Sequence, residues 1–303
     1  MSNSVVTTAS ISRLLLNYLK AVFSDYNTKP DQWHPIYKIV PSERKREYFE
    51  EMRLLANAAR KPEGTPISTS DTGQFVTTMI ENQAYGISAI FTREAIRYNQ
   101  YKQDFPRIAK ALMNSLTEVR NINTSTPINS GFDATQPIGD GQPLYSLNHP
   151  LDVGTYANTF STAADLSETN LEDAITQIQL LPSASGQLCN LEAELLVIPN
   201  VLQFQAKRLL ESKYRVGTTN NDINALYNNT YISKGEHIFS YMTNTTQWMI
   251  KTTEENGFIY LDSEKPTKDI TTNDSTFNVK ASIFEYYGVG VLNARCSFSA
   301  VGV

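Results

Sequence analysis

The chain has few of the residues on which metal sites and thiol chemistry depend. It contains 3 histidines and 2 cysteines in 303 residues. His34, His149 and His237 lie far apart, and none has a second His or Cys at ligand spacing. Cys189 and Cys296 fit neither a metal motif nor a disulfide framework. We therefore expect no zinc site, and we expect both thiols to be buried or without a chemical role.

The common catalytic and nucleotide-binding motifs are also missing. No serine stands in a Gly-x-Ser-x-Gly turn, and no glycine-rich loop has the spacing of a dinucleotide or phosphate cradle. Gly-x-Gly occurs only in a predicted loop (139–141) and in a predicted strand (288–290). Asp133 and Asp140 flank a glycine-rich loop, but their spacing is not that of an EF-hand, so we expect a solvated loop. We predict no enzymatic activity, no cofactor, and no catalytic, cofactor-binding or metal-binding residues.

Long apolar runs and excess positive charge are absent as well. No stretch approaches the ~20 apolar residues that cross a bilayer. The N-terminus lacks the basic and apolar regions of a secretion signal, so we expect synthesis in the cytoplasm. The net charge of −5 disfavours a sequence-specific nucleic-acid binder, because such affinity comes mainly from Lys and Arg that displace counterions.

The N-terminal quarter of the chain is predicted to be extended and only partly self-sufficient. Apolar residues recur at helical spacing from residue 10 to 26, and a proline-rich stretch follows to Pro41. This arm could dock on a neighbouring subunit or pack on its own domain. The charged stretch 42–60 is predicted to be a solvated helix or strand face. Residues 60–92 resemble a long β-hairpin-like excursion, with turn residues followed by two strand patterns.

The middle of the chain predicts two helices. Asp104 can cap a helix that runs to about Ile122, roughly 28 Å long. Residues 124–143 are predicted to form a loop. Thr169 and Glu172 match a capping box at the start of a second helix.

The last third predicts strands and a short helix. A buried strand over 195–198 is broken by Pro199, and a helix over 200–212 follows. Several short strands are expected between 228 and 262. From 277 to 291 apolar residues occupy alternate positions, interrupted only by Glu285, which predicts a long strand.

Two segments, Asp140–Leu151 and Leu195–Leu210, resemble parts of the major head subunits of tailed bacteriophages, in particular the Mu-like family. The resemblance covers most of residues 50–303, in the same order along the chain. One departure is Asn99-Gln100, where family members often carry an Asp pair. The other matching positions are Glu63-Gly64, Tyr85-Gly86, Thr92-Arg93-Glu94, the helix 104–122, Leu166-Ser167 and Tyr287-Gly288-Val289.

The resemblance implies an α+β chain with the Hong Kong 97 capsid fold. It implies an N-terminal arm (1–50), an extended loop (51–92), a peripheral domain with a long spine helix (93–190 and 272–303) and an axial domain (191–271). Such a subunit assembles with itself into pentamers and hexamers of an icosahedral head shell around double-stranded DNA. Scaffold, portal and cement or decoration proteins are further partners that it implies. The location is the virion, with assembly in the host cytoplasm.

Two other interpretations of the sequence stay open. An encapsulin-type compartment would share the fold but enclose an enzyme cargo. A tail or adhesion protein would suit the content of Asn, Thr and Tyr (16 Tyr) and would form elongated trimers without a long buried helix. Some relatives join their subunits covalently between a Lys and an Asn, and Lys61 lies near the extended loop.

Overall fold

The structure is a computed structural model that describes residues 31–53, 55, 57–67, 69, 73–94, 98, 104–214, 223–272 and 275–303. The expected helix over 10–26 and the Asn99-Gln100 departure lie outside these residues. The chain divides into two compact units. Among the described residues, the first holds Asp31, Asn82–Ile122 and Asp262–Tyr287, and the second holds Gln32–Glu81, Asn123–Leu261 and Gly288–Val303. The sequence-based division into arm, loop, peripheral and axial domains stays a prediction.

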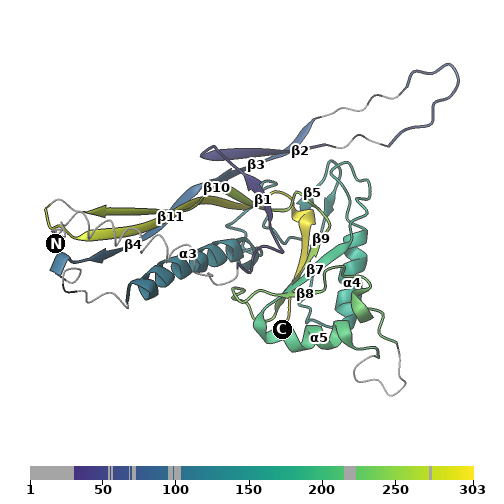
Figure 1. Cartoon of the computed structure of the whole chain (residues 1–303). Helices are drawn as coiled ribbons and strands as arrows, with labels where there is room; N and C mark the ends of the chain where they lie inside the picture. The colour runs from purple at the N-terminus through teal and green to yellow at the C-terminus, as the bar shows by residue number, and fades with distance from the viewer. Residues whose placement is uncertain are drawn as a thin grey trace. The chain divides into compact units, whose positions relative to one another are not determined.

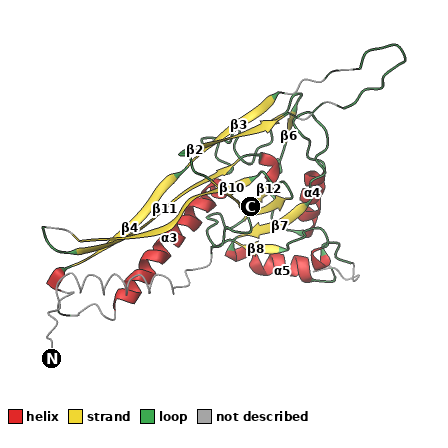
Figure 2. Ribbon diagram, turned by 45° about the horizontal axis from the view of Figure 1, so that its top comes forward, coloured by secondary structure: helices red, strands yellow, loops and turns green. Residues whose placement is uncertain are grey.

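The first unit is built from a long helix and a sheet (Figure 2). The helix is α3 (Asp104–Asn129), and the strands are β4 (Gln83–Phe91), β10 (Phe258–Thr272) and β11 (Val279–Val291), in the order β10-β11-β4. The strands β4 and β11 are antiparallel, with Ile87 opposite Ile283. The buried core of this unit consists of Phe91, Ala109, Leu112, Leu116, Val279, Ala281 and Ile283. The apolar side of the predicted helix, with Ala109, Leu112 and Leu116, therefore packs on the alternate apolar residues of the long C-terminal strand.

The interruption of that strand pattern is explained by a buried ion pair. Glu285 lies on the inward face of β11 and is 1% exposed. Its carboxylate pairs with the Arg120 guanidinium of α3, which also pairs with Asp31 at 2.8 Å. Burial raises the pKa of Glu285, and Arg120 acts in the opposite direction. A charge is accepted on the inner face because its partner reaches it from the helix.

The helix α3 continues beyond its predicted end at Ile122 to Asn129, through Pro127. Proline removes one helical hydrogen bond, and Thr, Ser and Asn are weak helix formers. Tertiary contacts compensate. The Tyr37 hydroxyl donates to the Thr124 carbonyl at 2.6 Å, and the Gln247 amide donates to the Ile128 carbonyl at 3.2 Å. The expected loop 124–143 therefore begins only after the helix ends.

The second unit contains a four-stranded sheet in the order β12-β9-β7-β8. The strands are β7 (Ala193–Ile198), β8 (Glu236–Ile238), β9 (Gln247–Thr252) and β12 (Ser297–Val301). The central strand β7 confirms the predicted buried strand. The helices α4 (Glu168–Gln179) and α5 (Gln203–Glu211) contribute to the same core, which includes Leu171, Leu196, Leu210, Trp248 and Phe298. Short 3-10 turns are η1 (Asn200–Leu202), η2 (Tyr227–Asn229) and η3 (Ala294–Cys296).

The start of α4 differs from the predicted capping box. Ser167, and not Thr169, is the N-cap, and its side chain accepts from the Asn170 amide N–H. Asn170 in turn donates its side-chain amide to the Asp165 carbonyl at 2.7 Å. The local pattern was right about a helix, but the Ser residue two positions earlier has the extended backbone that a cap requires.

The predicted hairpin is displaced towards the N-terminus. Its strands are β2 (Arg46–Met52) and β3 (Gln74–Glu81), which pair antiparallel, whereas β4 belongs to the sheet of the first unit. The charged stretch 42–60 thus holds a strand, and its alternate residues Phe49 and Glu51 are half-buried. The strand β1 (Lys38–Pro41) also belongs to this unit, as do residues Phe258–Leu261 at the start of β10, the strand next to β1 in its sheet. A short pair, β5 (His149–Pro150) with β6 (Thr155–Tyr156), completes the unit.

Candidate functional site: the root of the extended loop

A cluster of polar contacts in the second unit lies where the chain leaves the hairpin of β2 and β3. In Figure 1 the described part of the loop between these strands, residues 57–67, lies well beyond the ends of β2 and β3. We call Glu51, Arg53 and Leu55, with the groups that hold them, the loop root. Three alternate residues, Glu51, Arg53 and Leu55, each contact a different segment of the unit. The register between β2 and β3 also shifts between Glu51 and Met52, a bulge that turns the strand at this point.

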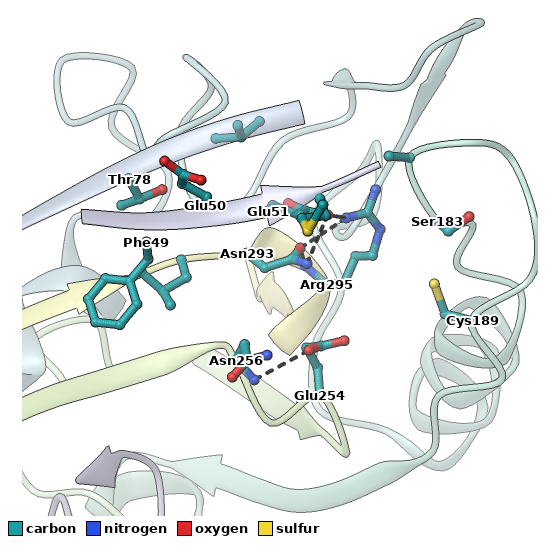
Figure 3. Close-up of a pocket in the computed structure, with 14 residues that line it drawn as sticks. Phe49, Glu50, Glu51, Thr78, Ser183, Cys189, Glu254, Asn256, Asn293 and Arg295 are labelled. Atoms are coloured by element: carbon teal, nitrogen blue, oxygen red, sulfur yellow. Dashed lines mark hydrogen bonds and ion pairs between the residues drawn. The ribbon is translucent and has the colours of Figure 1, made fainter. Parts of the chain in front are cut away.

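The innermost contact joins Glu51 to Arg295 of η3 (Figure 3). One guanidinium nitrogen of Arg295 donates to the Glu51 carboxylate at 2.8 Å, and its Nε donates to the Pro182 carbonyl at 2.6 Å. The Asn293 side chain caps η3 and also accepts from the guanidinium at 3.2 Å. Arg295 is 3% exposed. A guanidinium held in this way orients the carboxylate of the outgoing strand.

The electrostatic balance at Glu51 follows from its half-buried position. Burial raises the pKa of the Glu51 carboxyl, while the charge and hydrogen bond of Arg295 lower it, and burial prevails. The charged pair is therefore held against a desolvation cost.

Arg295 is itself held by a stack of side chains behind it. Its guanidinium lies 4.7 Å from the centre of the Tyr156 ring, and that ring stacks on His149 at 5.0 Å. His149 is fully buried, with Nδ1 2.7 Å from the Asp140 carboxylate. The loop Asp140–Leu151, singled out in the sequence, thus supports the root through His149, which stacks on the Tyr156 ring next to Arg295.

Asn158 fixes the orientation of the His149 ring. Its Nδ2 donates to three carbonyls, those of Leu144, Ala294 and Ser297. Its Oδ1 must then face the other way, 3.1 Å from His149 Nε2 and 2.9 Å from the Ser146 amide, from which it accepts. Both ring nitrogens of His149 are thus held by neighbouring side chains, Nδ1 by Asp140 and Nε2 by Asn158.

Two outer contacts complete the root. The Arg53 guanidinium pairs with Asp152 at 3.0 Å, and both side chains are about one-third exposed or less (36% and 26%). The Gln187 side chain donates to the Leu55 carbonyl at 2.8 Å. Across the loop, the Arg53 amide donates to the Gly73 carbonyl at 3.0 Å, which closes the two outgoing chains against each other.

A cavity of about 490 Å³ adjoins the root. Among its lining residues are Phe49, Glu51, Cys189, Glu254 and Arg295 (Figure 3). Burial raises the pKa of the Cys189 thiol, and raises that of the neighbouring Cys296 thiol to about 12. Raised values disfavour the thiolate, which is the nucleophilic form. The chemistry available here is therefore ion pairing and hydrogen bonding.

The residues considered from the sequence as ligands are dispersed. His34 stacks on Trp33, and the His237 ring lies 2.6 Å from the Gln32 carbonyl. Asp133 accepts from Thr135, whose hydrogen bonds lower the pKa of that carboxyl. In the described part of the chain, no three His, Cys, Asp or Glu residues gather as a metal site would require. Nor does any helix described there combine the length and hydrophobicity of a membrane span.

The sequence reasoning missed Glu51, Arg53, Asp152 and Arg295. In the sequence each of these four charged residues is typical of a solvated face, and together they form no motif. A usable signal was present only for Arg295. It is the one charged residue in the segment 286–303.

Comparison with known proteins places this fold. The phage capsid protein family matches residues 75–299. No curated protein sequence matches the chain. Among solved structures, the capsid of an empty GTA particle is similar with a TM-score of 0.59 and 9% identity over 100% of this chain and 99% of that chain. The procapsid of bacteriophage JBD30 gives 0.56 and 13%, over 98% of this chain and 76% of that chain.

A virus-like particle from Pyrococcus furiosus is also similar, with a TM-score of 0.52 and 8% identity over 95% of this chain and 98% of that chain. At such low identities the structural matches establish the shared fold alone. That fold is the mixed helix and strand Hong Kong 97 capsid fold expected from the resemblance. With the family match covering most of its length, the chain belongs to the phage capsid protein family.

Proposed function

We propose that this chain is the major head subunit of a tailed phage, which assembles with itself into pentamers and hexamers of an icosahedral shell around double-stranded DNA. The observation that carries the proposal is the capsid family match over residues 75–299. The net charge of −5 agrees with it, because a shell encloses DNA without gripping it over a broad area. Membership of the Mu-like branch is part of the proposal.

The extended loop supplies physical support for self-assembly. Large apolar side chains on the hairpin and loop are exposed: Tyr48 (61%), Met52 (69%), Leu55 (54%) and Ile67 (73%). Apolar side chains grouped on a projecting segment commonly mark a contact with another chain. Identical subunits that each cover a neighbour in this way, head to tail, close into rings.

The proposal includes the absence of an enzymatic role and residence in the virion, with assembly in the host cytoplasm. Scaffold, portal and decoration proteins are proposed partners. A covalent Lys61 crosslink is a separate question, since Lys61 is exposed in the loop. Denaturing gels of purified particles would show a ladder of multimers if the crosslink forms, and a single subunit band if it does not.

An encapsulin-type compartment is the second candidate, and the fold shared with the Pyrococcus furiosus virus-like particle favours keeping it. The two candidates differ in cargo. Particles purified from the native source should contain DNA under the main proposal and an enzyme under the alternative. Nuclease-protected DNA in the particles separates them directly.

Negative-stain electron microscopy of the expressed chain tests assembly itself. We expect closed shells, or rings of five and six subunits, as the concentration is raised. Elongated trimers, as a tail or adhesion protein would form, would contradict the proposal. Monomers that persist at high concentration with scaffold and portal proteins supplied would contradict it as well.

A further inference from the structure

We propose that Arg295, Asp152 and Gln187 are positioning residues that set the direction in which the extended loop leaves the subunit, and that this direction sets the size of the assembled shell. The second half of the statement rests on the proposed function. The first half concerns the subunit alone and can be tested without assembly.

The spacing of the three contacts is the first argument. Glu51 and Arg53 contact the body of the unit through their side chains, and Leu55 contacts it through its backbone carbonyl. Their partners are Arg295, Asp152 and Gln187 in turn. One contact would leave the strand free to pivot. Three contacts in a row along about 13 Å of chain fix its direction.

The second argument is that the contacts become weaker from Arg295 outward. The inner contact is buried, and Arg295 is held by the Pro182 carbonyl and the Tyr156 ring. It therefore acts as a fixed point. The Arg53–Asp152 pair is partly exposed, and the Leu55 contact is a single neutral hydrogen bond. The outer contacts can therefore adjust the angle without loss of the fixed point.

The third argument is the lever that the loop provides. The loop turns at Gly64, whose φ of +81° suits glycine, and the Thr65 amide closes this turn on the Pro62 carbonyl. Nine residues from Leu55 to the turn span at most about 30 Å. A rotation of about 5° at the root then moves the turn by roughly 3 Å, more than a close-packed interface tolerates. Small changes at the root therefore become changes in the angle between neighbouring subunits.

The experiment compares four chains with the unchanged protein. Asp152→Asn removes the outer ion pair from a partly exposed site and should fold normally. Arg295→Met removes the fixed point. Arg53→Asp combined with Asp152→Arg restores the ion pair in reverse. Asp173→Asn is the control, because it removes an exposed carboxylate of α4 for which no ion pair is found among the described residues.

Hydrogen exchange of the unassembled subunit is the first readout. The Arg53 amide, which is bonded to the Gly73 carbonyl, should exchange about two- to five-fold faster in Asp152→Asn, and more than about ten-fold faster in Arg295→Met. The reversed pair should return the rate towards that of the unchanged chain, and Asp173→Asn should leave it unaltered. Equal exchange in all chains would overturn the positioning role.

Particle diameter by electron microscopy is the second readout. We expect Asp152→Asn to shift or broaden the distribution, the reversed pair to narrow it again, and the control to match the unchanged chain. A variant that only folds less well would give fewer particles, but the particles would keep the same diameter. Faster exchange with constant diameters would overturn the link to shell size. If the unchanged chain forms no particles, the proposed function fails, and exchange still decides whether the root is held as described.

Discussion

Two arginine–glutamate pairs occupy opposite kinds of surroundings in this protein. Arg120 and Glu285 join a long helix to a long strand in the first unit, each inside a regular element. Arg295 and Glu51 join a 3-10 turn to the last residues of a short strand, beside a cavity. The first pair holds the helix against the strand inside the core. The second fixes the place where a loop departs, and the difference shows that similar chemistry can serve packing in one unit and orientation in the other.

The largest effect is expected from Arg120→Met, which leaves the Glu285 carboxylate buried without its partner. Removing one member of a buried ion pair costs about 3–5 kcal/mol of unfolding free energy. Urea unfolding of the subunit measures this loss. The double variant Arg120→Met with Glu285→Leu should recover the part of the loss that comes from Glu285, while the Asp31 carboxylate still loses its ion pair with Arg120. A loss below about 1 kcal/mol in the single variant would contradict the interpretation that Arg120 and Glu285 form a buried pair in the core.

Arg295→Met should cost less, about 2–3 kcal/mol, because its partner Glu51 remains partly open to solvent (27%). The same urea titration applies, and Glu51→Gln is the matched variant. It retains a hydrogen-bond acceptor for Arg295 and should cost roughly 1 kcal/mol. If Arg295→Met proved as costly as Arg120→Met, the distinction between the two pairs would not hold.

Both glutamates should make stability depend on pH in the same direction. Their folded pKa values lie above the ordinary value of 4.5, so each carboxyl binds its proton more tightly in the folded chain. The stabilisation linked to that proton is complete below the unfolded pKa and is lost as the pH rises through the folded pKa. The melting temperature of Glu285→Gln minus that of the unchanged chain should therefore increase as the pH is raised from about 4 to 7. A difference that stays constant across this pH range would contradict a raised folded pKa of Glu285.

The smallest change in stability is expected for Asp152→Asn. Its ion pair with Arg53 is partly exposed, and such pairs contribute less than about 1 kcal/mol. Calorimetry should show a melting temperature within a few degrees of the unchanged chain. Limited proteolysis within residues 57–67 should nevertheless be faster, because the loop root is looser. A clear drop in melting temperature would show that the outer contact supports the fold rather than the loop.

The parts of the fold that follow from local patterns could be predicted from the sequence. The buried strand at 195–198 and the long strand near the C-terminus both follow from the spacing of apolar residues. The end of α3 could not, because the Thr124 carbonyl is satisfied by the Tyr37 hydroxyl, 87 positions away. The capping box at Thr169 failed for a smaller reason, since Ser167 competes for the same role.

The loop root lies beyond the reach of local patterns altogether. Glu51 and Arg295 are 244 positions apart, and each stands in a segment that is ordinary when considered alone. Periodicity reports which face of an element is buried, but it does not report which distant charge will meet it. The Asp140–Leu151 loop was recognised through its resemblance to a family, and its physical role, as the support of Tyr156 and Arg295, became visible only in three dimensions.

Because Glu51 and Arg295 are 244 positions apart, the ribosome adds them to the chain at well-separated times. At about 5–20 residues per second, a ribosome needs roughly 12 to 50 s to reach Arg295 after it has joined Glu51 to the chain. During this interval the nascent subunit displays its loop without the residue that fixes it. Chains that stop short of Arg295 never acquire the fixed root, so readiness to join neighbours waits for the synthesis of this one residue.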